Sequence, residues 1–387
     1  MSLPAPRLLA CALPLLFTLA GCGTPSVAVE EKTPASFAEY VEETRAMVAR
    51  DRRFATADHQ SEIDWNTPWE MRPEHPDGRA VLFAHGLGEG PWTFLDTAKR
   101  LAEDGVLVRT VLLPGHGTKP EDMIARSTGE AWESVVRREK DRLKVEGDRV
   151  WLAGFSTGGN IAVTLGAEDP DVEGLLLFSP APYVRTNLVG LVPFASLFFE
   201  WLRTPEEAGG GTTAFRYRTL PMTGLVAYCD TMDHAEEALE KTYRKPVLTV
   251  LSEFDSIVDT ERMLEAADES FLNPRSRTIW YGDETPETKV MKVISLPSHL
   301  EKEHIRSFSH LSVNFSPENP HYGRGARAEW CRPENDPRPR FHCEIPESEI
   351  WYGAWGEERD GHVYVRLTYN PHFERQTEEV LAFLRGK

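Results

Sequence analysis

The feature that most constrains this fold is a rhythm of short apolar runs, each followed by a longer amphipathic stretch. Such alternation is typical of strand–helix units that build a largely parallel sheet. We therefore expect an α/β domain with a mostly parallel central sheet flanked by helices. The expected strands are residues 80–84, 106–113, 150–153, 174–178, 247–252 and 289–295, and the expected helices include 92–103, 129–145, 158–167 and 374–384.

Residues 182–245 interrupt that rhythm, because the stretch is far longer than a usual connection and contains a helix-like apolar run over 188–202. It predicts an inserted helical cap. The apolar side chains of the run fit two roles, the lining of an acyl pocket or the core of the cap itself, and both stay open. A second, polar insertion is expected at about residues 321–363, and one domain over 36–387 would carry both insertions.

A Gly-rich turn, GFSTG at residues 154–158, directly follows the expected strand 150–153 and precedes an expected helix. A serine on a strained strand-to-helix turn needs glycine neighbours, because a Cβ there would clash. The turn resembles the nucleophile elbow of the α/β-hydrolase family. The resemblance implies that Ser156 is the catalytic nucleophile.

The HGLG run at residues 85–88 ends the first expected strand and resembles the oxyanion loop of the same family. Backbone N–H groups must point at the oxygen that becomes negative during acyl transfer. The resemblance assigns those groups to Leu87 and Thr157. His85, and His116 in the family-like PGHG turn, are expected to be structural rather than catalytic.

An activated serine needs a base and a carboxylate, which follow in the order serine, acid, histidine in this fold. Asp255 comes just after the strand 247–252, and with Val258 it matches the D-x-x-V pattern of the family. Asp259 is the competing acid, but its place before Thr260 suits a helix cap better.

The base is expected to be His310, because the run FSHLS at residues 308–312 resembles the serine–histidine run of lipases and monoacylglycerol-lipase-like members. His299 also follows a serine and stays open as the alternative. The histidine of the triad follows the acid in this fold, and both candidates do.

These motifs give a resemblance to serine hydrolases of the α/β-hydrolase superfamily over residues 80–387, including carboxylesterases, monoacylglycerol lipases and serine aminopeptidases. It implies an α/β-hydrolase fold and cleavage of short or medium acyl esters or monoacylglycerol-like lipids through an acyl-enzyme, without cofactor or metal. An aminopeptidase, amidase or thioesterase would use the same triad, and a peptidase could hold a substrate amine with Glu206, Glu207 or Asp230. A surface-binding lipoprotein without activity is a further alternative.

The N-terminus has the pattern of a targeting segment, with Arg7 followed by apolar residues 8–19. Its end, LAGC at residues 19–22, resembles the bacterial lipobox. The resemblance implies a signal peptide over 1–21, lipidation of Cys22 and a tether over 22–35. Because Gly23 stands where an Asp favours the inner membrane, an exported protein anchored to the outer membrane or cell surface is expected. An ordinary signal peptide cleaved near Ala20 is the alternative.

Charge and cysteine content limit the other partners. The formal net charge of −18 argues against nucleic acid and anionic headgroups as partners. The hydrolase resemblance implies an ester or lipid as the partner, and the lipobox resemblance implies contact with the membrane through the lipid anchor. Cys331 and Cys343 form a plausible disulfide in an exported protein. No C-x-x-C or H-E-x-x-H spacing indicates a metal site, and nothing in the sequence fixes the oligomeric state.

Overall fold

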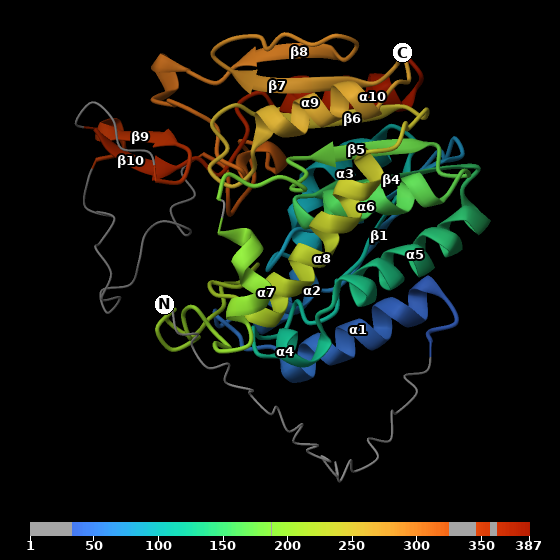
Figure 1. Ribbon diagram of the computed structural model, residues 1–387. Helices are drawn as coiled ribbons and strands as arrows, with labels where there is room; N and C mark the ends of the chain where they lie inside the picture. Colours follow the sequence, from blue (N-terminus) through green and yellow to red (C-terminus); the bar gives the residue numbers. More distant parts are fainter. Residues whose placement is uncertain (1–32, 187, 325–345, 357–361) are drawn as a thin grey trace, which may run out of the picture. The chain divides into compact units, whose positions relative to one another are not determined.

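A central sheet of eight strands carries the fold in a computed structural model, described for residues 33–186, 188–324, 346–356 and 362–387 (Figure 1). Every neighbouring pair in the sheet is parallel except β1 with β3. The strand order is β1-β3-β2-β4-β5-β6-β7-β8, with β1 Glu70–Met71, β2 Arg79–Ala84, β3 Leu107–Thr110, β4 Arg149–Phe155, β5 Gly174–Phe178, β6 Val247–Ser252, β7 Arg277–Gly282 and β8 Lys292–Pro297.

The strands alternate their side chains between two buried layers. In β2, Leu82 packs with one layer and Phe83 with the other, and Leu152 and Trp151 of β4 do the same. Both faces are therefore apolar, as a parallel sheet covered by helices requires. One face is covered by α5 Gly129–Glu146, α6 Thr157–Glu168 and α9 Thr260–Ser270, and the other by η1 Pro91–Phe94, α3 Leu95–Glu103 and α10 Phe373–Leu384.

The predicted α/β architecture is correct, and several predicted strands match within a few residues. Several details differ, and β1 is one of the strands that were not predicted. Strand β3 is shorter than the predicted strand 106–113, because residues 111–113 already belong to the turn into the PGHG loop. The last predicted strand lies later, at β8, and β7 was not predicted at all. The pair β9 Ile350–Gly353 and β10 Val363–Arg366 also went unpredicted, and it forms a separate parallel ladder.

The insertion after β5 has one long helix, α8 Met222–Leu239, which packs on α6 (Figure 1). The run 188–202, in contrast, is not the single helix that was predicted. It breaks into η2 Val189–Leu191, α7 Val192–Ala195 and turns. Its large apolar side chains are exposed rather than packed in a cap core: Leu188, Leu191, Phe194, Leu197, Phe198, Phe199 and Leu202.

An N-terminal arm (residues 37–66) precedes the sheet and contains α1 Phe37–Asp51 and α2 His59–Asn66. Ser36 caps α1 by accepting from the Glu39 N–H, as its sequence pattern indicates. The remaining short helices of the described residues are α4 Asp122–Arg126, η3 Glu301–Glu303, η4 Ser312–Asn314 and η5 Glu347–Glu349.

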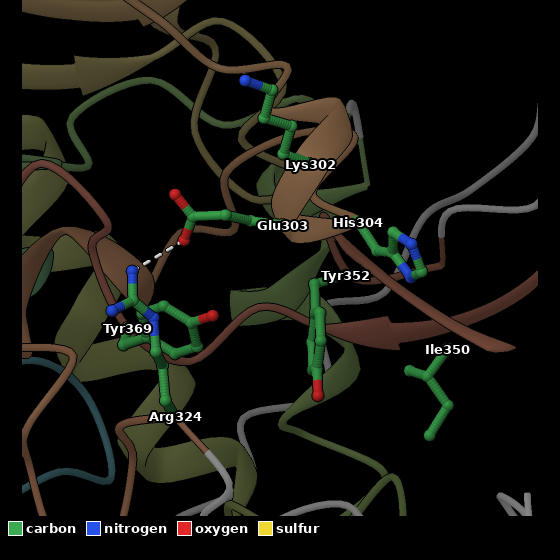
Figure 2. A pocket seen from close by; sticks show the side chains of 7 residues that line it. All are labelled: Lys302, Glu303, His304, Arg324, Ile350, Tyr352 and Tyr369. Carbon is green, nitrogen blue, oxygen red and sulfur yellow. Dashed lines mark hydrogen bonds and ion pairs between the residues drawn. The ribbon is translucent and has the colours of Figure 1, made fainter. Parts of the chain in front are cut away.

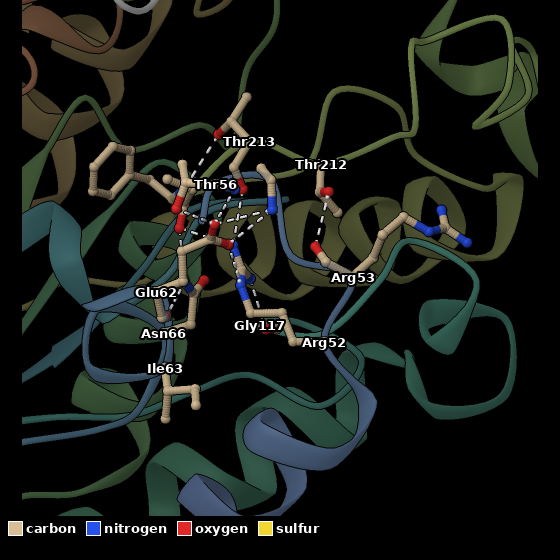
Figure 3. Close-up of polar contacts among 12 residues, drawn as sticks. Arg52, Arg53, Thr56, Glu62, Ile63, Asn66, Gly117, Thr212 and Thr213 are labelled. Carbon is tan, nitrogen blue, oxygen red and sulfur yellow. Dashed lines mark hydrogen bonds and ion pairs between the residues drawn. The ribbon is translucent and has the colours of Figure 1, made fainter. Parts of the chain in front are cut away.

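A buried ion pair ties the N-terminal arm to the rest of the domain (Figure 3). Arg52 Nε lies 2.9 Å from Glu62 Oε2, and the two side chains are 1% and 0% exposed. The guanidinium also donates to the carbonyls of Gly117, in the PGHG turn, and of Thr213 and Ala214, in the insertion, each at 2.8 Å. One arginine therefore holds three segments that lie far apart in the sequence.

Residues Ala35–Lys387 cluster as one compact unit with its own core. Within the described residues, none of the helices combines the length and apolar character needed to span a bilayer. The predicted lipidation site Cys22 and the predicted disulfide partners Cys331 and Cys343 fall outside the residues that the structure describes.

Candidate active site

Ser156 lies at a sharp turn between β4 and α6, with φ 54° and ψ −117°. A positive φ is uncommon for a residue with a side chain, and here the surrounding structure holds the strain. The turn leaves Ser156 at the carboxyl end of β4, next to the end of β2, where the strand order changes direction. Ligands of open α/β sheets bind at such a switch point.

The glycines around Ser156 are required by close backbone contacts. A Cβ on Gly158 would lie 1.9 Å from the carbonyl oxygen of Ala84, at the end of β2. A Cβ on Gly86 would lie 2.9 Å from Phe155 Cδ1 and 3.2 Å from Ser156 Cβ. These positions bring the HGLG loop against the Ser156 turn, so only glycine fits at both places.

Asp255 and His310 meet although 55 residues separate them in the sequence. His310 Nδ1 lies 2.6 Å from Asp255 Oδ2, and both residues are buried. The other carboxylate oxygen of Asp255 accepts from the N–H groups of Ile257 at 2.8 Å and Val258 at 3.0 Å. The carboxylate is thereby held in one orientation, with one oxygen left to face the imidazole.

The His310 ring also packs against Phe155, the residue before Ser156, with ring centroids 4.9 Å apart. The structure therefore brings His310 to the end of β4 and to Asp255 at the same time. A histidine with its Nδ1 held by a buried carboxylate is positioned to present Nε2 to a nearby hydroxyl.

The competing residues lie in other surroundings. His299 Nε2 lies 3.0 Å from Glu301 Oε2, and its side chain is 39% exposed. Asp259 is the N-cap of α9, where it accepts from the Arg262 N–H at 3.2 Å, as its position before Thr260 led us to expect. Neither His299 nor Asp259 forms a hydrogen bond or ion pair with Asp255 or His310.

Two buried histidines hold the HGLG loop in place. His85 Nε2 accepts from the Leu113 N–H, and His116 Nε2 accepts from the Gly88 N–H, each at 3.0 Å. An imidazole nitrogen that accepts from an N–H carries no proton, so both rings are neutral. Burial lowers the pKa of His116 to about 4, and burial together with the neighbouring His116 lowers the pKa of His85 well below its usual range. This structural role is the one expected from the sequence.

Tyr217 is a further contact to this loop that the sequence analysis missed. Its N–H donates to the Gly88 carbonyl at 2.8 Å, and its hydroxyl donates to the Gly115 carbonyl at 2.9 Å while accepting from the Thr118 N–H at 3.0 Å. The insertion thus supports the HGLG loop directly. No short-range pattern around Tyr217 could have indicated this contact.

The expected oxyanion donors, Leu87 and Thr157, lie on the two segments that meet at Ser156. Leu87 follows Gly86 in the loop that contacts Ser156, and Thr157 is the first residue of α6. The first N–H groups of a helix have no acceptor within the helix, and the helix dipole favours negative charge there. The Thr157 N–H can therefore serve a developing oxyanion, while Leu87 stays a prediction from the resemblance.

A pocket of about 240 Å³ lies elsewhere, beside β9 (Figure 2). It is lined by polar and aromatic side chains, among them Arg324, which forms an ion pair with Glu303 at 2.7 Å, and Tyr352. None of Ser156, Asp255 and His310 lines it, so we do not assign the reacting ester to this pocket.

Metal ligands do not gather in the part of the chain that the structure describes, where no group of three or more His, Cys, Asp or Glu side chains could hold an ion. The half-buried Cys229 has a thiol whose pKa burial raises to about 11, which makes it a poor nucleophile and a poor metal ligand at neutral pH.

Comparisons with known proteins show similarity to hydrolases. The family "Serine aminopeptidase, S33" matches residues 75–209. A thermostable monoacylglycerol lipase from Bacillus sp. (strain H-257) is 26% identical over 184 residues, which cover 46% of this chain and 71% of that protein. A carboxylesterase from Bacillus subtilis (strain 168) is 24% identical over 189 residues, covering 47% and 74%.

Among solved structures, one from work on LipS and LipT, two metagenome-derived lipolytic enzymes, aligns with a TM-score of 0.49 and 21% identity over 56% of this chain and 86% of that chain. The family match itself spans the HGLG loop, the PGHG turn and the Ser156 turn. Together with the parallel sheet and its strained turn, the family match and the two similar Bacillus enzymes identify the chain as a hydrolase of the α/β-hydrolase superfamily.

Proposed function

We propose that this hydrolase cleaves carboxylic esters through a covalent acyl-enzyme, with Ser156 as nucleophile, His310 as base and Asp255 as the residue that orients the base. The 2.6 Å contact between His310 Nδ1 and Asp255 Oδ2, next to the Ser156 turn, supports this most strongly. A hydroxyl becomes a useful nucleophile at neutral pH only when a positioned base removes its proton.

The proposed reaction runs in two halves. Ser156 Oγ attacks the ester carbonyl while His310 Nε2 takes its proton, and the N–H groups of Leu87 and Thr157 donate to the oxyanion. His310 then gives the proton to the departing alcohol, which leaves an acyl group on Ser156. Water, deprotonated by His310, attacks this acyl group. As the bond to Ser156 Oγ breaks, His310 returns the proton to Oγ, which releases the acid and restores the free enzyme. Asp255 stabilises the imidazolium that forms in both halves.

The proposed substrates are short or medium acyl esters or monoacylglycerol-like lipids. This choice is supported by two relatives whose names denote a monoacylglycerol lipase and a carboxylesterase. The same triad can cleave esters and thioesters, so the preference for esters rests on the similarity to these two relatives.

An aminopeptidase is the second candidate, because the matching family is described as serine aminopeptidase. Such an enzyme needs a carboxylate to hold the substrate amine. The carboxylates considered from the sequence do not gather for this purpose. Glu206 is exposed, Glu207 accepts from the Thr204 N–H at 2.8 Å, and Asp230 lies on α8 within 3.4 Å of the Gly129 N–H. Ester cleavage is therefore the better-supported proposal.

A fluorophosphonate probe and p-nitrophenyl esters test the proposal, applied to residues 23–387 and to the variants Ser156→Ala, His310→Ala and His299→Ala. We expect the parent to be labelled and to turn over esters, and Ser156→Ala to do neither. His310→Ala should lose turnover while His299→Ala, the matched control, keeps it. A parent that neither labels nor cleaves any ester would refute the proposal. Turnover of aminoacyl amides in preference to esters would favour the aminopeptidase.

We further propose that the protein is exported and anchored through a lipid on Cys22, on the strength of the lipobox-like LAGC run at residues 19–22. Metabolic labelling with a radioactive fatty acid in a bacterial host tests this. Labelled protein in the membrane fraction, lost in Cys22→Ser, is the expected result. Unlabelled protein released without its leader would support the ordinary signal peptide instead.

A further inference from the structure

The exposed leucines and phenylalanines between Leu188 and Leu202 form a cluster, here called the apolar patch. Seven of these side chains are 58–75% exposed. Other large apolar side chains that are exposed in the described residues, such as Val145, Val290 and Trp355, are scattered along the chain. Single exposed apolar residues are normal, but a concentrated cluster marks an interaction site.

The local backbone explains why these side chains face outward. η2 and α7 are single short turns joined by further turns, so the run has no continuous helical face to bury. Phe194 and Phe198 pack on each other, with ring centroids 5.2 Å apart, while each stays about two-thirds exposed. The run is attached at its two ends, and between them Val189 packs against the core and α7 contacts α8.

One end of the run is attached next to Asp255, and the other is attached just before α8. Val184 pairs with Val258, and the Arg185 side chain donates to the backbone carbonyls of Asp255 at 2.5 Å and Glu253 at 2.8 Å. At the other end Trp201 pairs with Pro221, directly before α8. The apolar patch thus leaves the sheet at the same edge as the Asp255–His310 pair.

The charge of the segment indicates which kind of lipid surface the apolar patch can bind. The sequence has no charged residue between Arg185 and Glu200, while the chain as a whole carries a formal net charge of −18. Attraction to anionic lipid headgroups would require clustered Lys and Arg, which this segment does not have. Apolar side chains gain free energy by leaving water whatever the headgroup charge, so an uncharged or zwitterionic lipid surface suits the patch.

We propose that the apolar patch docks the domain on a zwitterionic lipid surface, with the active-site edge of the sheet turned toward the lipid. The proposal concerns binding and does not depend on the chemistry assigned to Ser156. If Cys22 carries the proposed lipid, residues 23–35 can span at most about 45 Å, which keeps the domain within reach of the membrane. The lipid anchor would then limit the distance between the domain and the membrane, and the apolar patch would set the orientation of the domain on the membrane.

Flotation with phosphatidylcholine vesicles tests the docking, using residues 23–387 so that no lipid anchor contributes. We expect the parent to float with the vesicles and to keep doing so at raised salt, because the attraction is not ionic. Phe194→Ser and Phe198→Ser should each weaken binding roughly tenfold, since each removes a large apolar side chain from the lipid. Val290→Ser and Trp355→Ser, which change exposed apolar residues outside the patch, are the matched controls and should bind like the parent.

Folding and activity are followed separately with thermal unfolding and a water-soluble p-nitrophenyl ester, on which the patch variants should match the parent. A parent that does not float, or controls that lose binding as much as the patch variants, would overturn the docking proposal. A patch that instead holds two copies together would show as a dimer in lipid-free solution that Phe198→Ser converts to a monomer, and this result would also overturn it. Failure of the soluble-ester assay in the parent would count against the proposed chemistry and leave the vesicle result intact.

Discussion

Removing the Glu62 carboxylate should destabilise the domain strongly. Its oxygens contact Arg52 Nε at 2.9 Å, the Ala55 N–H at 2.9 Å, and the N–H and hydroxyl of Thr56 at 2.5 and 2.7 Å. Glu62→Ala leaves the guanidinium of Arg52 in a site where its side chain is 1% exposed. Breaking a buried ion pair in this way costs about 3–5 kcal/mol of unfolding free energy.

Urea denaturation of the parent and of Glu62→Ala measures this cost as a difference in the free energy of unfolding. Glu62→Gln keeps the shape and one acceptor oxygen but replaces the other oxygen with an NH2 group, and it should cost less than Glu62→Ala, about 1–3 kcal/mol. The double variant Arg52→Met/Glu62→Leu removes both charges and should recover part of the loss, because no unpaired charge stays buried.

The reasoning fails if Glu62→Ala costs less than about 1 kcal/mol, or if the double variant loses as much as the two single variants added together. Either result would mean that water reaches the guanidinium, or that the three carbonyls of Gly117, Thr213 and Ala214 satisfy it without its carboxylate. The urea curves would show either case as a small difference in the free energy of unfolding.

The remaining predictions concern the active site. Asp255→Asn should lower kcat by about 10⁴-fold with p-nitrophenyl esters while leaving the unfolding temperature nearly unchanged, and unaltered turnover would remove Asp255 from the mechanism. Gly158→Ala, whose new Cβ would meet the Ala84 carbonyl at 1.9 Å, should abolish fluorophosphonate labelling and lower the unfolding free energy by about 3 kcal/mol. The pKa of His116 is about 4 in the folded protein and 6.5 when unperturbed, so the unfolded chain binds more protons between these values. Stability from this group is complete above pH 6.5 and falls by about 3 kcal/mol as the pH drops to 4. His116→Gln should show a shallower loss in urea curves at pH 7 and 4.5, and an equal loss would contradict the assignment.

The sequence predicted the parts of this fold that depend on local patterns. The strands that end at Ala84, Phe178 and Ser252 are buried apolar runs closed by a turn, and each lies within a residue of its predicted bounds. β7 was missed although its Ile279, Trp280 and Tyr281 favour a strand. Only three consecutive residues of β7, Ile279 to Tyr281, are apolar, against four in β5 and five in β2, so its apolar stretch is too brief to stand out from a loop.

The contacts that hold the candidate site could not be predicted, because they join distant segments. Arg52 looks like any surface arginine until Thr213 and Ala214 are folded beside it. The run 188–202 was wrongly predicted as a helix, because an apolar segment without alternation looks the same whether it is buried or exposed. Only the arrangement in space distinguishes the two cases.

The reach of Arg52 also has a consequence for how the protein folds during synthesis. Its carbonyl partners at Thr213 and Ala214 lie 161 and 162 residues further along the chain. At about 10 residues per second, a ribosome needs roughly a quarter of a minute to produce them. The N-terminal arm is therefore made first but can be locked in place only after the insertion has been made. Throughout that interval the guanidinium can pair with Glu62 and the Gly117 carbonyl, and a chain cut short before residue 213 would lack the two carbonyls that join the arm to the insertion.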